Sequence, residues 1–124
     1  MNDIVWLVPR PPEAKGQRKS NTTGFPKKGY WVAHIDVADA HRYALYGDVY
    51  DDVFANYGAR YIVRGGDQHV FEGTVKSRTV VVEFESLTVA IDCYNSFEGQ
   101  QAKALRTAFS QGDLVIVEGL EDAE

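Results

Sequence analysis

The 124-residue sequence contains a single cysteine, Cys93. An intramolecular disulfide and a cysteine-rich zinc site are therefore both excluded. The sequence also lacks any run of about 18 apolar residues, the length that a membrane-spanning helix needs. A secretory pattern is missing as well, because the apolar stretch from Ile4 to Val8 is short and follows no basic residue. We therefore expect a cytoplasmic protein with no membrane partner.

Basic residues are scarce in most of the chain. The first 28 residues carry six basic and two acidic side chains, whereas the remaining 96 carry seven basic and sixteen acidic ones. An acidic body of this kind argues against nucleic acid as a partner. The basic N-terminal residues either lie on the acidic body of the same or a neighbouring chain, or form a solvated tail.

Three regions differ in composition. Residues 1–28 form an N-terminal arm or linker: prolines 9, 11 and 12 end a short apolar stretch, and a polar segment with little periodicity follows. This arm is either disordered or docks its first strand on a sheet edge. Residues 29–119 have the patterning of one folded domain, and residues 120–124 are an acidic tail.

Strand and helix patterns alternate within the domain. Apolar residues that recur at every second position predict strands at about 30–37, 60–64, 79–85 and 114–119. Helical spacing predicts helices at about 40–57, 87–94 and 97–109. The aromatic stripe of the first helix is expected to be core, and the last helix has Ala102, Leu105, Arg106 and Phe109 at its periodic positions.

Polar and glycine residues mark the ends of these elements. Asp39, Ser86 and Ser96 are the predicted helix N-caps. Gly58 is expected to end the first helix and Gly112 the last, while Gly65 and Gly66 break the second strand. An extended segment at 68–72 and a polar hairpin connection at 73–78 are expected to follow that break.

The order β-α-β-β-α-β predicts an α+β, ferredoxin-like fold. Right-handed crossovers place the third strand between the first and second, with the fourth beside the first. The four-stranded sheet is then antiparallel, with the helices on one face. The strand residues expected to meet the helices are Trp31, Tyr61, Val63, Val80, Val82 and Phe84.

No predicted helix or strand of the chain packs on the second face of such a sheet. Its apolar side chains would be Val32, Ile62, Val81 and either Val115 or Ile116. Its polar side chains would be His34, Asp36, Arg60, Arg64 and Glu83. Because an apolar patch of this kind is usually hidden, we expect a homodimer that packs sheet on sheet.

Several short motifs occur in the same order as in a known family. They are Lys28-Gly29-Tyr30-Trp31, Tyr57-Gly58, Arg64-Gly65-Gly66, Glu72-Gly73, Val81-Val82-Glu83-Phe84 with Ser86, Tyr94-Asn95-Ser96, Ala104-Leu105-Arg106 and Val115-Ile116-Val117-Glu118-Gly119. In these motifs the sequence resembles domain of unknown function 1330, over about residues 28–119. The resemblance implies a dimeric α/β barrel and no established reaction. One departure is Phe97-Glu98-Gly99-Gln100, where the family usually has Pro-Glu-Tyr-Gln.

Four polar residues form the candidate site: His34, Asp36, Arg64 and Glu83, all predicted on the face away from the helices. They form either an ion-pair network, with Arg64 neutralising Glu83 within or across a dimer, or a polar pocket for a small ligand. His34 beside Asp36 is a candidate for an oriented general base, and His34, Asp36 and Glu83 are the catalytic candidates. Neither a metal nor a cofactor is predicted, since a third ligand beside His34 and Asp36 is not evident.

Three functions are compatible with this pattern. The first is a homodimer that binds a small polar or anionic molecule in a cavity at the sheet–sheet interface. The second is a small cofactor-independent enzyme, monooxygenase-like or an isomerase, that uses His34, Asp36 and Glu83. The third is a purely structural dimer.

Overall fold

The computed structural model describes residues 27–120, apart from the side chain of Tyr46. The predictions for residues 1–26 and 121–124, which include most of the N-terminal arm and of the acidic tail, lie outside that part. The elements are β2 (Gly29–Val37), α1 (Ala40–Asn56), β3 (Arg60–Arg64), β4 (Arg78–Phe84), α2 (Leu87–Asn95), α3 (Phe97–Phe109) and β5 (Ser110–Glu118).

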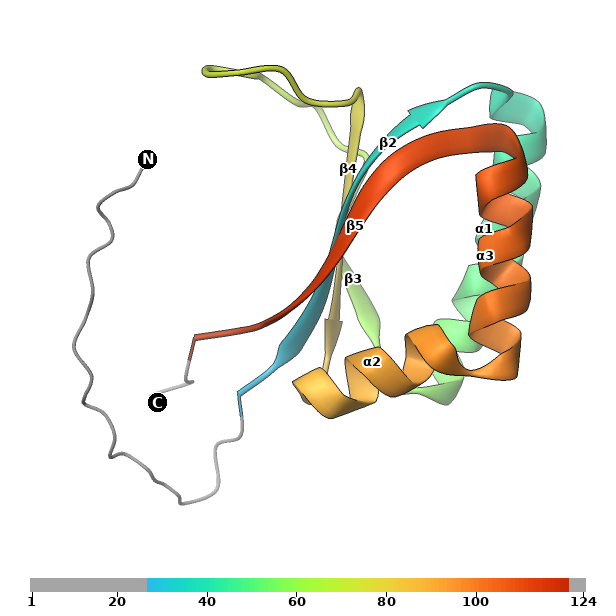
Figure 1. The fold of residues 1–124 in the computed structure, drawn as a ribbon, viewed down its shortest axis with the longest axis vertical. Helices are drawn as coiled ribbons and strands as arrows, with labels where there is room; N and C mark the ends of the chain where they lie inside the picture. Colours follow the sequence, from blue (N-terminus) through green and yellow to red (C-terminus); the bar gives the residue numbers. More distant parts are fainter. Residues whose placement is uncertain (1–26, 121–124) are drawn as a thin grey trace. The chain divides into compact units, whose positions relative to one another are not determined.

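These elements form an antiparallel four-stranded sheet in the order β3-β4-β2-β5. The three helices lie together on one side of the sheet (Figure 1). The predicted strand order and the ferredoxin-like fold are therefore confirmed. We call the side away from the helices the open face.

The helix boundaries follow from the predicted caps. The side chains of Asp39 and Ser86 each accept a hydrogen bond of 3.1 Å, from the backbone nitrogens of Arg42 and Val89 respectively. Ser96 accepts one of 2.9 Å from the nitrogen of Gly99 and separates α2 from α3. Gly58 follows the end of α1 at φ 65°, the left-handed conformation expected of it.

The core lies between the sheet and the helices and is centred on Trp31. Its indole Nε1 donates a 2.9 Å hydrogen bond to the carbonyl oxygen of Ala90 in α2. Its ring lies 5.2 Å from the ring of Phe54 and 5.4 Å from that of Phe84, between centroids. Trp31 thus joins the central strand β2 to α1, α2 and β4.

Gly99, where the chain departs from the family pattern, lies where α3 begins close to the end of α2. A Cβ atom at this position would overlap with the carbonyl oxygen of Cys93. The turn between the two helices is therefore tighter than a tyrosine at this position would permit.

Two predicted boundaries are wrong. Gly112 does not end the last helix, because α3 ends at Phe109 and β5 already begins at Ser110. Gly112 instead lies within β5, where a Cβ atom would come within 2.6 Å of the His34 carbonyl oxygen on β2. Residues 68–72 are not a strand but part of a 13-residue connection, residues 65–77, between β3 and β4.

A β-bulge in β3 changes which side chains face the helices. Tyr61 pairs with Val82, but Val63 pairs with Val81 and Arg64 with Val80, so Ile62 is an extra residue. The predicted alternation therefore fails beyond Tyr61. Val63 was expected to meet the helices but lies on the open face, and Arg64 was expected on the open face but lies on the helix side.

Candidate functional site

Glu83 lies on the open face and is hydrogen-bonded to residues of both neighbouring strands. Its carboxylate accepts 3.0 Å hydrogen bonds from Arg60 Nε on β3 and from the Tyr30 hydroxyl on β2. The hydrogen bond from Arg60, helped by that from Tyr30, lowers the pKa of Glu83 from its ordinary value although burial opposes this. Glu83 is therefore a paired carboxylate, and its partner within the chain is Arg60 rather than the expected Arg64.

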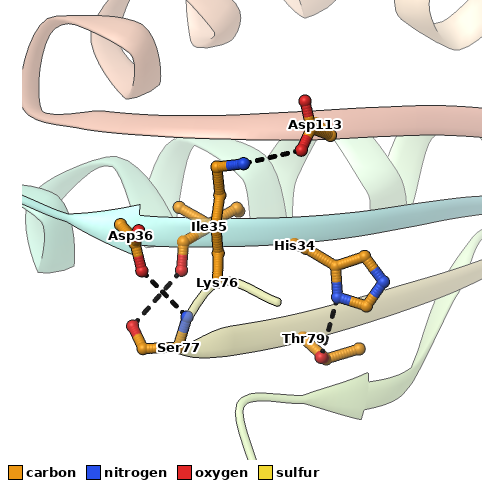
Figure 2. Close-up of polar contacts among 7 residues, drawn as sticks. All are labelled: His34, Ile35, Asp36, Lys76, Ser77, Thr79 and Asp113. Carbon is orange, nitrogen blue, oxygen red and sulfur yellow. Dashed lines mark hydrogen bonds and ion pairs between the residues drawn. The ribbon is translucent and has the colours of Figure 1, made fainter. Parts of the chain in front are cut away.

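Asp36 lies at the end of β2 near the start of β4 (Figure 2). Its Oδ1 accepts a 2.8 Å hydrogen bond from the backbone nitrogen of Ser77. Nearby, Lys76 Nζ donates to Asp113 Oδ2 at 2.7 Å, and this hydrogen bond lowers the pKa of Asp113. Asp36 thus holds the backbone of Ser77 in place. It forms no hydrogen bond with His34, whose partner is Thr79.

His34 belongs to a chain of hydrogen bonds on the open face. Its Nδ1 is 3.1 Å from the Thr79 hydroxyl oxygen (Figure 2). Thr79 donates its only hydroxyl hydrogen to Gln68 Oε1, and Gln68 Nε2 donates to the Lys76 carbonyl oxygen at 2.8 Å. Thr79 must therefore accept a hydrogen from His34, so Nδ1 is the donor in this hydrogen bond.

Arg64 lies apart from the other three predicted residues, on the helix side of the sheet. Its Nη2 is 3.3 Å from Asp51 Oδ1 of α1. Its guanidinium lies 4.2 Å from the centroid of the Tyr61 ring, a cation–π distance. The structure therefore brings His34, Asp36 and Glu83 to one face and places Arg64 on the other.

A pocket of about 70 Å³ lies on the helix side, where Arg64 is located. Its walls come from the four strands and from α1 and α3, and much of its lining is apolar or aromatic. Three of the lining residues are arginines from different elements: Arg64 of β3, Arg78 of β4 and Arg106 of α3. Among the residues that line the pocket within the described range, none is acidic.

Two of these arginines have donors without partners. Within residues 27–120, the Nε atoms of Arg78 and Arg106 are buried and have no hydrogen-bond partner. A buried donor left unsatisfied costs about 1–3 kcal/mol, and more when it is charged. Such groups call for an explanation, and an anionic ligand that accepts from them would supply one.

Two tyrosines of the pocket wall, Tyr50 and Tyr61, remain protonated. Burial raises the pKa of Tyr61 to about 12. Burial also raises the pKa of Tyr50, although the neighbouring Arg106 guanidinium opposes the rise. Neither of these two side chains therefore offsets the positive charge of the arginines at neutral pH.

A glycine makes room for one of the arginines. A Cβ atom at Gly65 would overlap with the guanidinium of Arg78, whereas one at Gly47 would lie at an ordinary contact distance, 3.6 Å, from Arg64 Nη2. Gly65 also has φ 72°, a left-handed conformation that favours glycine. Both the turn and the space for Arg78 therefore depend on this glycine.

Arg78 and Arg106 were not among the predicted site residues. The one available signal was Arg106, a basic residue at a periodic, core-facing position of its helix.

In the part of the chain that the structure describes, no group of three histidine, cysteine, aspartate or glutamate side chains could hold a metal ion. None of the helices within residues 27–120 is both long and apolar enough to cross a membrane.

Residues 28–120 match the family described as "Domain of unknown function (DUF1330)". The chain belongs to this family. The match covers the whole sheet and all three helices, so it includes both the open-face residues and the pocket. No curated protein matches this DUF1330 chain.

Solved structures share the fold of this DUF1330 chain at low sequence identity. A protein of unknown function from Rhodopseudomonas palustris is 15% identical, with a TM-score of 0.63, over 77% of this chain and 85% of the other. A cofactor-independent oxygenase from Streptomyces nogalater is 8% identical, with a TM-score of 0.53, over 77% of this chain and 96% of the other. At such identities the likeness concerns the fold alone.

Proposed function

We propose that this protein binds a small organic anion with an apolar body in the pocket between the sheet and the helices. The observation that carries the proposal is the pair of buried, unpartnered Nε atoms of Arg78 and Arg106 in its wall. A carboxylate has two oxygens and can accept from both guanidinium groups. The aromatic rings of Trp31 and Phe54 in the same wall suit an apolar body.

The size of the pocket limits the ligand. A volume of about 70 Å³ is well below the roughly 300–1,000 Å³ of pockets for drug-sized molecules. It suits a short-chain carboxylate, or the carboxylate end of a single-ring acid whose ring lies partly outside the pocket. Such a ligand would lie on the helix side of the sheet rather than at the sheet–sheet interface, where the sequence placed it, because Glu83 and Asp36 on the open face are already hydrogen-bonded.

The first prediction concerns Arg78 and Arg106. Replacing either with methionine should weaken benzoate binding by roughly 10–100-fold, because a hydrogen bond to a charged group contributes about 1.5–3 kcal/mol. The free energy of unfolding of the ligand-free Arg78→Met protein should stay equal or rise, since the change removes a buried unsatisfied donor. Isothermal titration calorimetry with benzoate and urea unfolding measure the two quantities.

Matched controls separate charge recognition from general effects. Arg42→Met removes an arginine that lies 5.5 Å from the Phe109 ring centroid and does not line the pocket, so it should leave binding unchanged. Benzamide, which has the same ring without the charge, should bind far more weakly than benzoate. The proposal is wrong if no carboxylate from acetate to phenylacetate stabilises the wild-type protein more than the Arg106→Met variant.

We further propose that the open face joins two copies of the chain. The register places Val63, Val81, Val32 and Val115 side by side across all four strands, and we call these residues the valine band. Val115 is 56% exposed and Ile62 beside the band is 46% exposed. Sheet-on-sheet packing of two copies would bury this band and close the dimeric barrel.

The second prediction tests this homodimer. Val115→Lys should convert a dimer into a monomer, because the substitution would place a charge in an apolar interface. Sedimentation velocity at micromolar concentration measures the state. Leu105→Lys, which changes an exposed leucine of α3 on the opposite layer, should leave the dimer intact. A wild-type protein that sediments as a monomer at these concentrations would refute the proposal.

A further inference from the structure

The connection between β3 and β4, residues 65–77, carries the most exposed aromatic side chain described outside the helices. We call this segment the β3–β4 arm. Phe71 on the arm is 92% exposed, and Val70 and Val75 are exposed as well. An aromatic ring is among the largest sources of favourable burial in an interface. Three large apolar side chains on one polar connection thus indicate a surface that is covered by another molecule.

The base of the arm is fixed to the open face. Gln68 and Lys76 are joined across the arm by the 2.8 Å hydrogen bond from Gln68 Nε2 to the Lys76 carbonyl oxygen. Lys76 also pairs with Asp113 of β5 at 2.7 Å, and Ser77 donates to Asp36 of β2 at 2.8 Å (Figure 2). The arm therefore leaves the sheet in a set direction, held by residues of the open face.

That direction leads away from the helices. Figure 1 shows the arm extending from the top of β4 on the side of the sheet opposite α1 and α3. A body that packs on the open face would consequently lie beside the arm. The valine band and the apolar arm then lie on the same side of the sheet.

We propose that the β3–β4 arm packs on a second copy of this chain, with Phe71 as its apolar anchor. The inference rests on the sheet-to-sheet homodimer proposed above. In a two-fold symmetric dimer each copy both supplies an arm and receives one, so a single exposed aromatic residue contributes twice. The anchors on β2 and β5 place the arm next to the strands that carry Val32 and Val115 of the valine band, which favours a second copy over an unrelated partner.

A photo-crosslinker at position 71 tests the inference on the full chain. Benzoylphenylalanine in place of Phe71 should give, on irradiation, a covalent species of two chains. In a mixture of ¹⁴N- and ¹⁵N-labelled protein, a share of the cross-linked peptides should combine one label of each kind, which shows that the link joins two chains. The same probe in place of Phe97, which is 75% exposed on the helix layer, should give no two-chain species.

A second variant makes the result quantitative. Phe71→Ser should weaken self-association by roughly 10–100-fold, as loss of an aromatic hot spot does, while far-ultraviolet circular dichroism stays unchanged. Suppose that the wild type is a dimer and that Val115→Lys dissociates it. If Phe71→Ser then leaves self-association unchanged and the crosslinker gives no two-chain species, the arm inference is wrong and the homodimer proposal stands. If the wild type is a monomer, the homodimer proposal and the inference both fail.

Discussion

Replacing Trp31 with alanine is expected to lower the free energy of unfolding by about 3–5 kcal/mol. The indole is 4% exposed and touches aromatic rings from both α1 and β4. The substitution opens a cavity at the centre of the sheet. It also leaves the Ala90 carbonyl oxygen without its 2.9 Å hydrogen bond from Nε1. Domains are typically stable by only about 5–15 kcal/mol, so this one change could remove most of the stability.

Urea unfolding at a fixed protein concentration measures this effect, since self-association would otherwise shift the midpoint. Trp31→Phe keeps an aromatic ring but loses the hydrogen bond, so it should fall between wild type and Trp31→Ala. Phe97→Ala, which changes an exposed ring, should stay within about 0.5 kcal/mol of wild type. A loss below about 1 kcal/mol for Trp31→Ala would show that the core is not centred on this residue.

Gly65→Ala is expected to weaken benzoate binding by roughly 10–100-fold, as the loss of one charged hydrogen bond would. The added methyl group would overlap with the Arg78 guanidinium and push it away from the pocket. Because the guanidinium is the far end of a flexible side chain, it can move. The loss of stability should therefore be only the about 1–2 kcal/mol that a left-handed conformation costs a non-glycine residue.

Gly58→Ala is the matched control for this substitution. Gly58 has nearly the same left-handed conformation, φ 65° against 72°, but a Cβ atom there would meet no heavy atom within 4 Å. The two variants should therefore lose similar stability in urea, whereas only Gly65→Ala should lose affinity in calorimetry. Equal benzoate affinities for the two variants would contradict the placement of Arg78 in the binding site.

The fold could be predicted because local signals agree with the tertiary structure. Asp39, Ser86 and Ser96 cap the helices in which they were expected. The strand order follows from element order and crossover handedness alone. The bulge in β3 could not be predicted, because Ile62 is an ordinary strand residue and nothing local distinguishes an extra residue from a paired one.

The candidate site was only partly predictable for the same reason. In β3, the predicted faces of the residues after Tyr61 depended on unbroken alternation, so Val63 and Arg64 were both placed on the wrong face. The pocket also gathers Arg64, Arg78 and Arg106 from three elements that are distant in sequence. Only tertiary contact makes them neighbours. Gly65 is similar: the sequence marks it as a bend, but the room that it leaves for Arg78 is a property of the folded chain.

Cys93 is wholly buried in the core, and burial raises the pKa of its thiol to about 12. Since it is the only cysteine in the sequence, maleimide reagents should find no accessible native thiolate at neutral pH. A cysteine introduced at an exposed position, such as 105 on α3, would then carry a fluorophore or spin label without prior removal of the native residue. Distances between identical labels on two copies could be measured directly in an otherwise unaltered chain.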